Sequence, residues 1–141
     1  MKEFSLKIGQ DGRLSGLPYH DSSLLSIVYE DERQLEIGLK NSFGSITKLS
    51  FRSVSEINFS NVCNGSIISE IFVWKVATAP VNFAAPDDVW NVLYRDRYGK
   101  DVALMREEAI RSDGDDYIIL VQCSYGGNIA CICGEIIGNV I

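Results

Sequence analysis

The chain lacks any long apolar run. Nowhere in its 141 residues is there an uninterrupted apolar stretch approaching the roughly 18 residues that a membrane helix needs. The amino terminus reads Met1-Lys2-Glu3-Phe4, without the basic segment and apolar stretch of a secretion signal. We therefore expect a cytoplasmic protein with no membrane segment.

Positive charge is also scarce. The 13 Lys and Arg residues are outnumbered by 19 Asp and Glu, for a formal charge of -6. Binding to a nucleic-acid backbone depends on clustered Lys and Arg, so we do not expect a nucleic-acid partner. An acidic surface suits a basic protein partner, or it only keeps the domain soluble, and composition alone favours the second interpretation.

Metal-binding motifs are missing as well. The chain has one histidine and four cysteines, Cys63, Cys123, Cys131 and Cys133, without a C-x2-C pair. In a reducing cytosol these cysteines are expected to be free thiols, and three of them lie in the most apolar part of the chain, where Cys behaves as a small hydrophobe. A zinc site would need a fourth ligand and the missing spacing. We expect no metal and no cofactor.

The most informative stretch is the C-terminal one. Two apolar runs, Tyr117–Val121 with Cys123 and Ile129–Cys133, meet across the glycine-rich segment Ser124–Asn128, which is the pattern of a β-hairpin. Both runs are almost continuously apolar, as in strands that are covered on both faces. We expect this hairpin to form the centre of the sheet.

The register of that hairpin has two candidate solutions. A three-residue loop of Gly126 to Asn128 would set Cys123 opposite Cys131, whereas a two-residue loop, Gly126-Gly127, would set it opposite Ala130. Only the first of these gathers three sulfurs on one face, because side chains repeat every two residues along a strand.

The first half of the chain alternates apolar and polar residues, the period of half-buried strands. We expect a short edge hairpin near residues 4–17, followed by an antiparallel meander. In this meander the first strand is expected to have apolar contacts on both sides, and the second strand one solvent-exposed face. A further strong strand follows the meander. The expected strands are Ser23–Glu30, Gln34–Lys40, Ser45–Arg52 and Ile67–Val76.

The period then changes to that of a helix. After a crossover loop at Ala77–Ala85, Pro86 opens a stretch in which Val89, Trp90, Leu93 and Tyr94 recur at helical spacing. Gly99 is expected to end it. A weaker helix from Asp101 to Ala109 is predicted next, with a strand or an irregular loop as alternatives. The chain is thus expected to be a single α+β domain over residues 1–141, mostly antiparallel sheet in a sandwich or half barrel, with one or two short helices in its C-terminal half.

His20 is the only histidine, and it is followed by Asp21 and Ser22. Adjacent side chains on an extended segment point in opposite directions, so these residues do not predict a catalytic triad, whose members converge from different places. We expect Asp21 or Ser22 to bond to nearby backbone amides. His20 is either a binding residue or packed beside Tyr19.

Two further groups are candidate binding residues. Asp113 and Asp115 belong to an acidic turn whose spacing fails the calcium-loop pattern. Tyr98 and Tyr125 lie at predicted turns and are expected to be exposed, whereas Trp74 and Trp90 are expected in the core. A surface that joins turn tyrosines to nearby acids would suit a basic protein partner.

Three segments carry a resemblance to known proteins. Leu17–Ser22 before a strand, Val54–Ile68 with its Asn-Gly turn, and the hairpin at Ser124–Gly127 resemble small bacterial proteins of unassigned function. Some of those are similar to immunity proteins, which protect a cell from its own polymorphic toxins. The resemblance implies a cytosolic, acidic, single-domain inhibitor that blocks a toxin by surface binding, and it assigns no functional residues.

Two functional hypotheses follow. The first is a non-enzymatic bacterial binding protein of the immunity type, recognised by a flat acidic face with exposed tyrosine. The alternative is a small-molecule-binding domain or a hydrolase, recognised by a deep cavity that gathers His20 with a cysteine or several acids. A homo-oligomer formed through a sheet edge is compatible with both.

Overall fold

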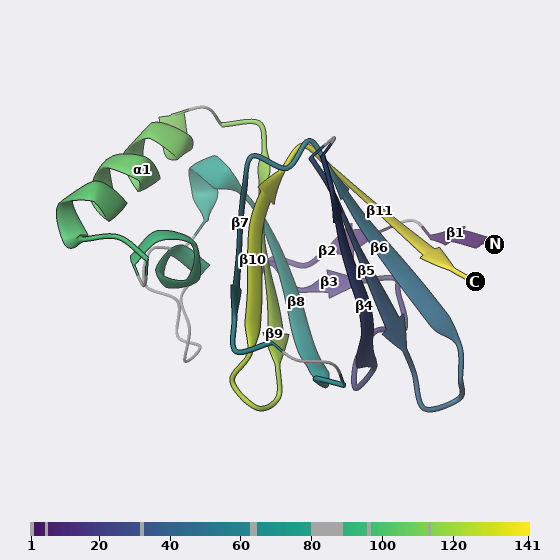
Figure 1. Ribbon diagram of the computed structural model, residues 1–141. Helices are drawn as coiled ribbons and strands as arrows, with labels where there is room; N and C mark the ends of the chain where they lie inside the picture. Colours follow the sequence, from purple (N-terminus) through teal and green to yellow (C-terminus); the bar gives the residue numbers. More distant parts are fainter. Residues whose placement is uncertain are drawn as a thin grey trace.

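The computed structural model describes residues 2–4, 6–31, 33–62, 65–79, 89–95, 97–112 and 114–141. Two antiparallel sheets diverge from a shared corner as the layers of an open sandwich, and the helical segments cover the outer face of the smaller sheet (Figure 1). The expected fold class is confirmed, and the sheets do not close into a barrel.

The larger sheet has five strands in the order β1-β11-β6-β5-β4. Their bounds are Lys2–Phe4 for β1, Glu135–Val140 for β11, Ile46–Arg52 for β6, Gln34–Lys40 for β5 and Ser23–Glu30 for β4. The predicted meander is therefore present as β4, β5 and β6, because short polar turns leave neighbouring strands no other partner as near.

The smaller sheet has four strands in the order β7-β10-β9-β8, and the early hairpin pairs β2 with β3. The bounds are Glu56–Ser60 for β7, Asn128–Cys133 for β10, Tyr117–Cys123 for β9, Ile68–Lys75 for β8, Lys7–Ile8 for β2 and Leu14–Ser15 for β3. The two middle strands of this sheet are those of the predicted C-terminal hairpin. All six residues of β10 are buried, as continuous apolar runs predict.

Both candidate registers of that hairpin are wrong. Its loop is Ser124 to Gly126, so that Cys123 lies opposite Gly127 and donates its N–H to the Gly127 carbonyl at 2.8 Å. The physical reason is that Gly126 has φ +92° and occupies the last position of a three-residue turn, where a left-handed residue is needed. Cys123, Cys131 and Cys133 nonetheless share the core between the sheets, because this register and the first predicted one differ by an even number of residues.

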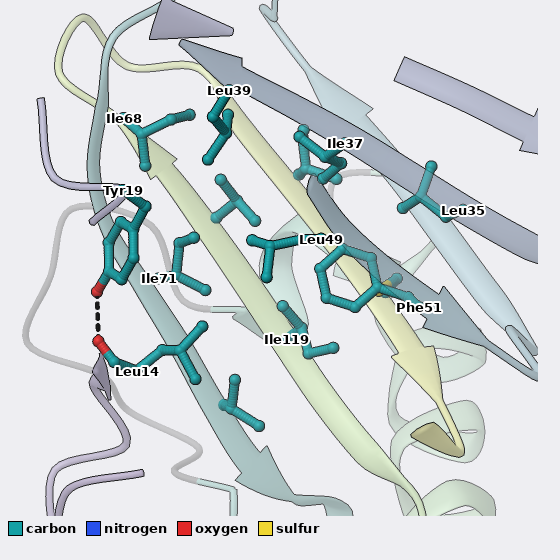
Figure 2. Close-up of a cluster of buried hydrophobic side chains, with 14 of the residues drawn as sticks. Leu14, Tyr19, Leu35, Ile37, Leu39, Leu49, Phe51, Ile68, Ile71 and Ile119 are labelled. Carbon is teal, nitrogen blue, oxygen red and sulfur yellow. Dashed lines mark hydrogen bonds between the residues drawn. The ribbon is translucent and has the colours of Figure 1, made fainter. Parts of the chain in front are cut away.

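The core between the sheets is formed mainly by large aliphatic side chains, with Phe51 and Tyr19 as buried aromatic members (Figure 2). From the larger sheet it takes Leu35, Ile37, Leu39, Leu49 and Phe51, and from the smaller sheet Ile68, Ile71 and Ile119, all of them fully buried or nearly so. Truncating such a residue to alanine costs about 2–5 kcal/mol. This core holds the sheets rigidly enough to position the turns at their ends.

Strand β4 has its predicted bounds but not its predicted surroundings. Only Leu24 is buried, and the residues from Leu25 to Glu30 are exposed. Apolar contacts on both sides were expected, and that expectation is wrong, because both faces of β4 are exposed beyond Leu24. An apolar pattern records side-chain character and not what lies beside the strand.

Of the two predicted helices, the one predicted to be weaker is the longer in the structure. The first predicted helix is short: Val89 and Trp90 are helical and continue into a single π-helical segment, η2 (Asn91–Arg95). The weaker prediction is the long helix α1 (Lys100–Ser112, 13 residues), so the strand and loop alternatives are wrong. A 3₁₀ turn, η1 (Val76–Thr78), begins at the last residue of the predicted strand and runs into the predicted crossover, and Pro80 to Asp88 lie outside the described residues. None of the helices in the described ranges has the length and apolarity to cross a membrane.

Candidate functional site

Several turns lie at one end of the sandwich, the end at which the two sheets stand apart in Figure 1, which we call the loop end: residues 19–22, 41–45, 65–67 and 124–127. The start of β4 pairs with the end of β5 through Ser23 and Lys40. On the smaller sheet, the Asp21 N–H donates to the Ile68 carbonyl at 2.9 Å, and the Ser124 N–H donates to the Ile67 carbonyl at 2.8 Å. The turns of both sheets are thus tied together, and Figure 1 shows the β5–β6 and β9–β10 turns at the same end.

Two hairpin tips at the loop end carry almost fully exposed aromatic side chains. Phe43 is 93% exposed and Tyr125 is 92% exposed. The Asn41 side chain orders the first tip, because its Oδ1 accepts from the N–H groups of Phe43 and Ser45 at 3.0 and 2.9 Å. The exposure predicted for Tyr125 is confirmed. Phe43 was missed, although an apolar residue in the middle of the recognised turn 41–44 was a usable signal.

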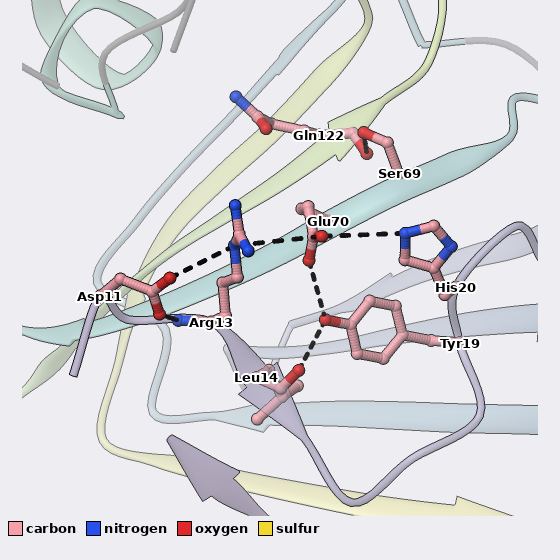
Figure 3. Close-up of polar contacts among 8 residues, drawn as sticks. All are labelled: Asp11, Arg13, Leu14, Tyr19, His20, Ser69, Glu70 and Gln122. Carbon is pink, nitrogen blue, oxygen red and sulfur yellow. Dashed lines mark hydrogen bonds and ion pairs between the residues drawn. The ribbon is translucent and has the colours of Figure 1, made fainter. Parts of the chain in front are cut away.

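A polar cluster lies on the turn before β4 (Figure 3). His20 Nδ1 is 3.3 Å from Asp21 Oδ2, and His20 Nε2 is 3.7 Å from Glu70 Oε1 on β8. These contacts are ion pairs when the imidazole is protonated. His20 and Asp21 are well exposed, so His20 is not packed in the core beside Tyr19.

The roles expected for Asp21 and Ser22 are not found. Asp21 has φ +61°, and within the described part of the chain its carboxylate accepts no backbone amide. Ser22 is buried and its Oγ donates to the Pro18 carbonyl at 3.4 Å. The turn is therefore held by main-chain bonds, among them Ser22 N–H to the Tyr19 carbonyl, and the Asp21 carboxylate is left to solvent and His20.

Tyr19 anchors this turn through its buried side chain. Its buried hydroxyl donates to the Leu14 carbonyl at 2.6 Å and also lies 3.4 Å from Glu70 Oε2. Burial raises the pKa of Tyr19 to about 12, and the nearby Glu70 charge adds to the effect. The hydroxyl is consequently protonated at neutral pH and serves as a donor.

Glu70 is the centre of the cluster, and sequence reasoning missed it. Its carboxylate is 4.0 Å from Arg13 Nε, and the same nitrogen is 3.4 Å from Asp11 Oδ2. Exposed ion pairs of this kind contribute about 0–1 kcal/mol each. They form a polar rim around the turn before β4 without adding much rigidity.

The remaining candidate residues do not join the loop end. Tyr98 packs against the core of the helical layer. The guanidinium groups of Arg97 and Arg106 lie 5.3 and 4.4 Å from the centre of its ring. Tyr98 is therefore only partly exposed, less than its position at a predicted turn indicated. Asp115 lies before β9, at the far end from Tyr125, where its carbonyl accepts from Lys75 Nζ at 2.9 Å. Asp113 lies outside the described residues.

Two cavities bear on the small-molecule hypothesis. One of about 200 Å³ lies at the loop end, lined by Asn61, Gly65, Ser66, Ile67, Cys123, Tyr125 and Gly127. The other, of about 350 Å³, lies between the β2–β3 hairpin and β11 and is lined mostly by Leu6, Ile8, Leu14, Tyr117 and Ile136. His20 lines neither of them. The arrangement that would have favoured the alternative, His20 inside a deep cavity with a cysteine or acids, is not formed by these two.

Two of the cysteines, Cys131 and Cys133, are not placed as reactive thiols. Cys131 and Cys133 are both buried, and the hydrogen bond from Cys133, together with burial, raises the pKa of Cys131 well above its ordinary value. A neutral thiol is a poor nucleophile. Among the described residues no group of three or more His, Cys, Asp and Glu side chains is placed to hold a metal ion.

Comparison with protein-family models, curated proteins and solved structures finds no match to this chain. The candidate site is therefore defined by geometry: the exposed aromatic tips Phe43 and Tyr125 and the polar rim of His20, Asp21 and Glu70 lie at the same end of the sandwich.

Proposed function

We propose that this chain is a non-enzymatic binding protein that holds a protein partner on its loop end. The observation that carries the proposal is the exposure of Phe43 and Tyr125 at the tips of hydrogen-bonded turns at one end of the molecule. Burying aromatic side chains dominates the binding energy of many protein interfaces. Turns that are already ordered lose little conformational entropy on binding.

The polar rim suggests the chemistry of the partner. Asp21 is well exposed, and the Glu70 carboxylate is shared between Arg13 and His20. With a chain charge of -6, these carboxylates favour a basic surface on the partner. This is the mode of action that the resemblance to bacterial immunity proteins implies, in which a toxin is blocked by surface binding.

The experiment is an affinity capture from the native host, with the products of neighbouring genes as candidates. The wild-type chain is compared with a Phe43→Ala/Tyr125→Ala double variant and with Met105→Ala, which removes an exposed apolar side chain from α1. We expect one partner to be retained by wild type and by Met105→Ala, lost by the double variant, and released as salt rises, since exposed charges are screened.

Equal recovery of a partner by all three proteins would place the interface elsewhere and overturn the loop end as the binding site. Recovery of no partner at any salt concentration would refute the protein-binding function itself. Because Phe43 and Tyr125 are almost fully exposed, the double variant should keep the thermal stability of wild type, within about 0.5 kcal/mol of unfolding free energy per site.

A second candidate function rests on the larger cavity. Its volume of about 350 Å³ falls in the lower range of small-molecule sites, about 300–1,000 Å³, and its walls combine apolar side chains with polar atoms, among them Glu135. A small apolar ligand with a positive or donor group would suit it. Alkyl amines that raise the melting temperature of wild type, but not of a cavity-filling Ile8→Trp variant, would support this function.

A further inference from the structure

A third cavity lies at the end of β8 that is away from the loop end. Its volume is about 350 Å³, in the lower range of small-molecule sites, about 300–1,000 Å³. Ile68 at the start of β8 bonds to Ser22 of the loop end, so the strand separates the two sites by about 23 Å. The residues that shape the cavity are Ile8, Gly12, Trp74, Lys75, Thr78 and Tyr117.

The outer edge of β8 is covered at Val73 and open beyond it. The Val73 N–H donates to the Gly12 carbonyl at 2.7 Å. Every second residue of an antiparallel strand directs its main-chain groups to the same side, so Lys75 directs its N–H and C=O to the same edge as Val73. The Lys75 carbonyl accepts from Thr78 Oγ1 at 3.4 Å. No described residue accepts from the Lys75 N–H, which leaves a main-chain donor at the wall of the cavity.

Lys75 also supplies the charge of this cavity. Of the described residues that line it, Lys75 alone is charged, although the chain as a whole carries a formal charge of -6. Its ammonium lies 4.1 Å from the centre of the Tyr117 ring and donates to the Asp115 carbonyl at 2.9 Å. Within the described part of the chain no carboxylate pairs with it, and Asp11 on the adjacent turn is paired with Arg13 at 3.4 Å (Figure 3). An ammonium has three N–H donors, so donors remain for an anion.

Two aromatic side chains give the cavity rigid apolar walls. The Trp74 ring is stacked on Phe72, with 5.3 Å between the ring centres and 3° between the planes. The turn after β2 lies against the indole, because a Cβ at Gly12 would collide with Trp74 Nε1. Tyr117 is half-buried and packs against the core between the sheets. Walls that are already ordered lose little conformational entropy when a ligand binds.

We propose that this cavity binds a small aromatic carboxylate. The carboxylate group lies at Lys75, whose ammonium and main-chain N–H are the available donors. The ring of the ligand lies against Trp74 and Tyr117. Hydrogen bonds between charged partners are stronger than those between neutral ones, and aromatic pairs contribute beyond the apolar area that they bury.

The sign of the charge distinguishes this site from the neighbouring cavity beside β11. The two cavities share Ile8 and Tyr117 as walls. The charged side chain of the neighbouring cavity is Glu135, whereas that of the cavity at β8 is Lys75. The first therefore favours a cationic ligand and the second an anionic one.

The first test is a titration of the purified chain with phenylpropionate, followed by amide NMR, with phenylpropionamide as the uncharged control. A ligand of this size should bind with a dissociation constant of about 1 mM or lower. The signals of the Lys75 N–H and the Trp74 indole N–H should shift, and that of Tyr125 at the loop end should not. The amide should bind at least about fivefold more weakly, because it lacks the charge. Absence of binding, shifts only at other residues, or an amide that binds equally well would each overturn the proposal.

The second test removes the cation. Lys75→Met keeps a side chain of similar length and should weaken the binding of phenylpropionate by about tenfold, without weakening that of the amide. Lys40→Met makes the same charge change at an exposed position on β5 and should bind like wild type. Because Lys75 is exposed, its replacement should leave the melting temperature close to that of wild type. Equal affinity of Lys75→Met and wild type for phenylpropionate would refute the site.

These outcomes are separate from those of the proposed functions. A Phe43→Ala/Tyr125→Ala variant that loses its protein partner should still bind phenylpropionate, since the cavity at β8 is unchanged. Glu135→Gln, which changes the neighbouring cavity, should weaken the response to alkyl amines and should not weaken the binding of phenylpropionate. Loss of phenylpropionate binding in either variant would contradict the placement of the site at Lys75.

Discussion

Replacing Tyr19 with phenylalanine tests whether its buried hydroxyl holds the turn that carries His20. The hydroxyl donates to the Leu14 carbonyl at 2.6 Å, and the ring lies in the core between the sheets. Tyr19→Phe keeps the ring and removes the donor. A buried carbonyl that loses its donor costs about 1–2 kcal/mol of unfolding free energy, so the variant should be less stable than wild type by that amount at pH 8.

The same hydroxyl makes this difference depend on pH. Burial raises the pKa of Tyr19 to about 12, against an ordinary value of 10.0 in the unfolded chain. The raised pKa means that the folded state favours the protonated hydroxyl, so its stabilisation is complete below pH 10 and is lost as the pH rises toward 12. Between pH 8 and pH 11 this group alone should cost wild type about 1.4 kcal/mol.

The expected result is therefore that the difference in unfolding free energy between wild type and Tyr19→Phe decreases as the pH rises. Phenylalanine does not titrate, so the advantage of wild type over Tyr19→Phe should shrink from about 1–2 kcal/mol at pH 8 to nearly zero at pH 11. The assay is urea unfolding followed by tryptophan fluorescence at four pH values. Taking the difference between the two proteins cancels other titrations, including that of Tyr94, whose pKa is also raised by burial.

Tyr125→Phe is the matched control, because it removes a hydroxyl from an exposed tip and should leave the unfolding free energy nearly unchanged at pH 8. A gap between wild type and Tyr19→Phe that stays constant from pH 8 to 11 would refute the role of the buried hydroxyl. So would a Tyr19→Phe variant as stable as wild type at pH 8.

Two further predictions concern the turns. Arg33 has φ +58° at a turn position that Gly12, Gly44 and Gly126 occupy in the other hairpins. Arg33→Gly should therefore raise the unfolding free energy by up to about 1 kcal/mol. A lower unfolding free energy of the variant, measured by urea unfolding, would contradict the backbone strain at Arg33. A Cβ at Gly127 would lie 2.8 Å from the Asn61 carbonyl oxygen, so Gly127→Ala should cost about 1–3 kcal/mol. Gly99→Ala, where a Cβ meets nothing within 4 Å, is the control and should be nearly neutral.

The strands were predictable because their signal is local. Ser23–Glu30 and Gln34–Lys40 have the bounds that alternation and polar turns indicated, since a strand with one buried face repeats every two residues. The register of the last hairpin was not predictable from its apolar runs. It depends on which glycine takes the left-handed position, and Gly126 and Gly127 are equally suited by composition.

The candidate site was predictable only in part, because its contacts join distant segments. Tyr125 was found from its turn, but Glu70 meets His20 across fifty residues of sequence, and no local pattern reports such a pairing. Tyr98 follows the same turn logic as Tyr125, yet a neighbouring helix places Arg106 over its ring. A turn predicts exposure only where no other element packs on it.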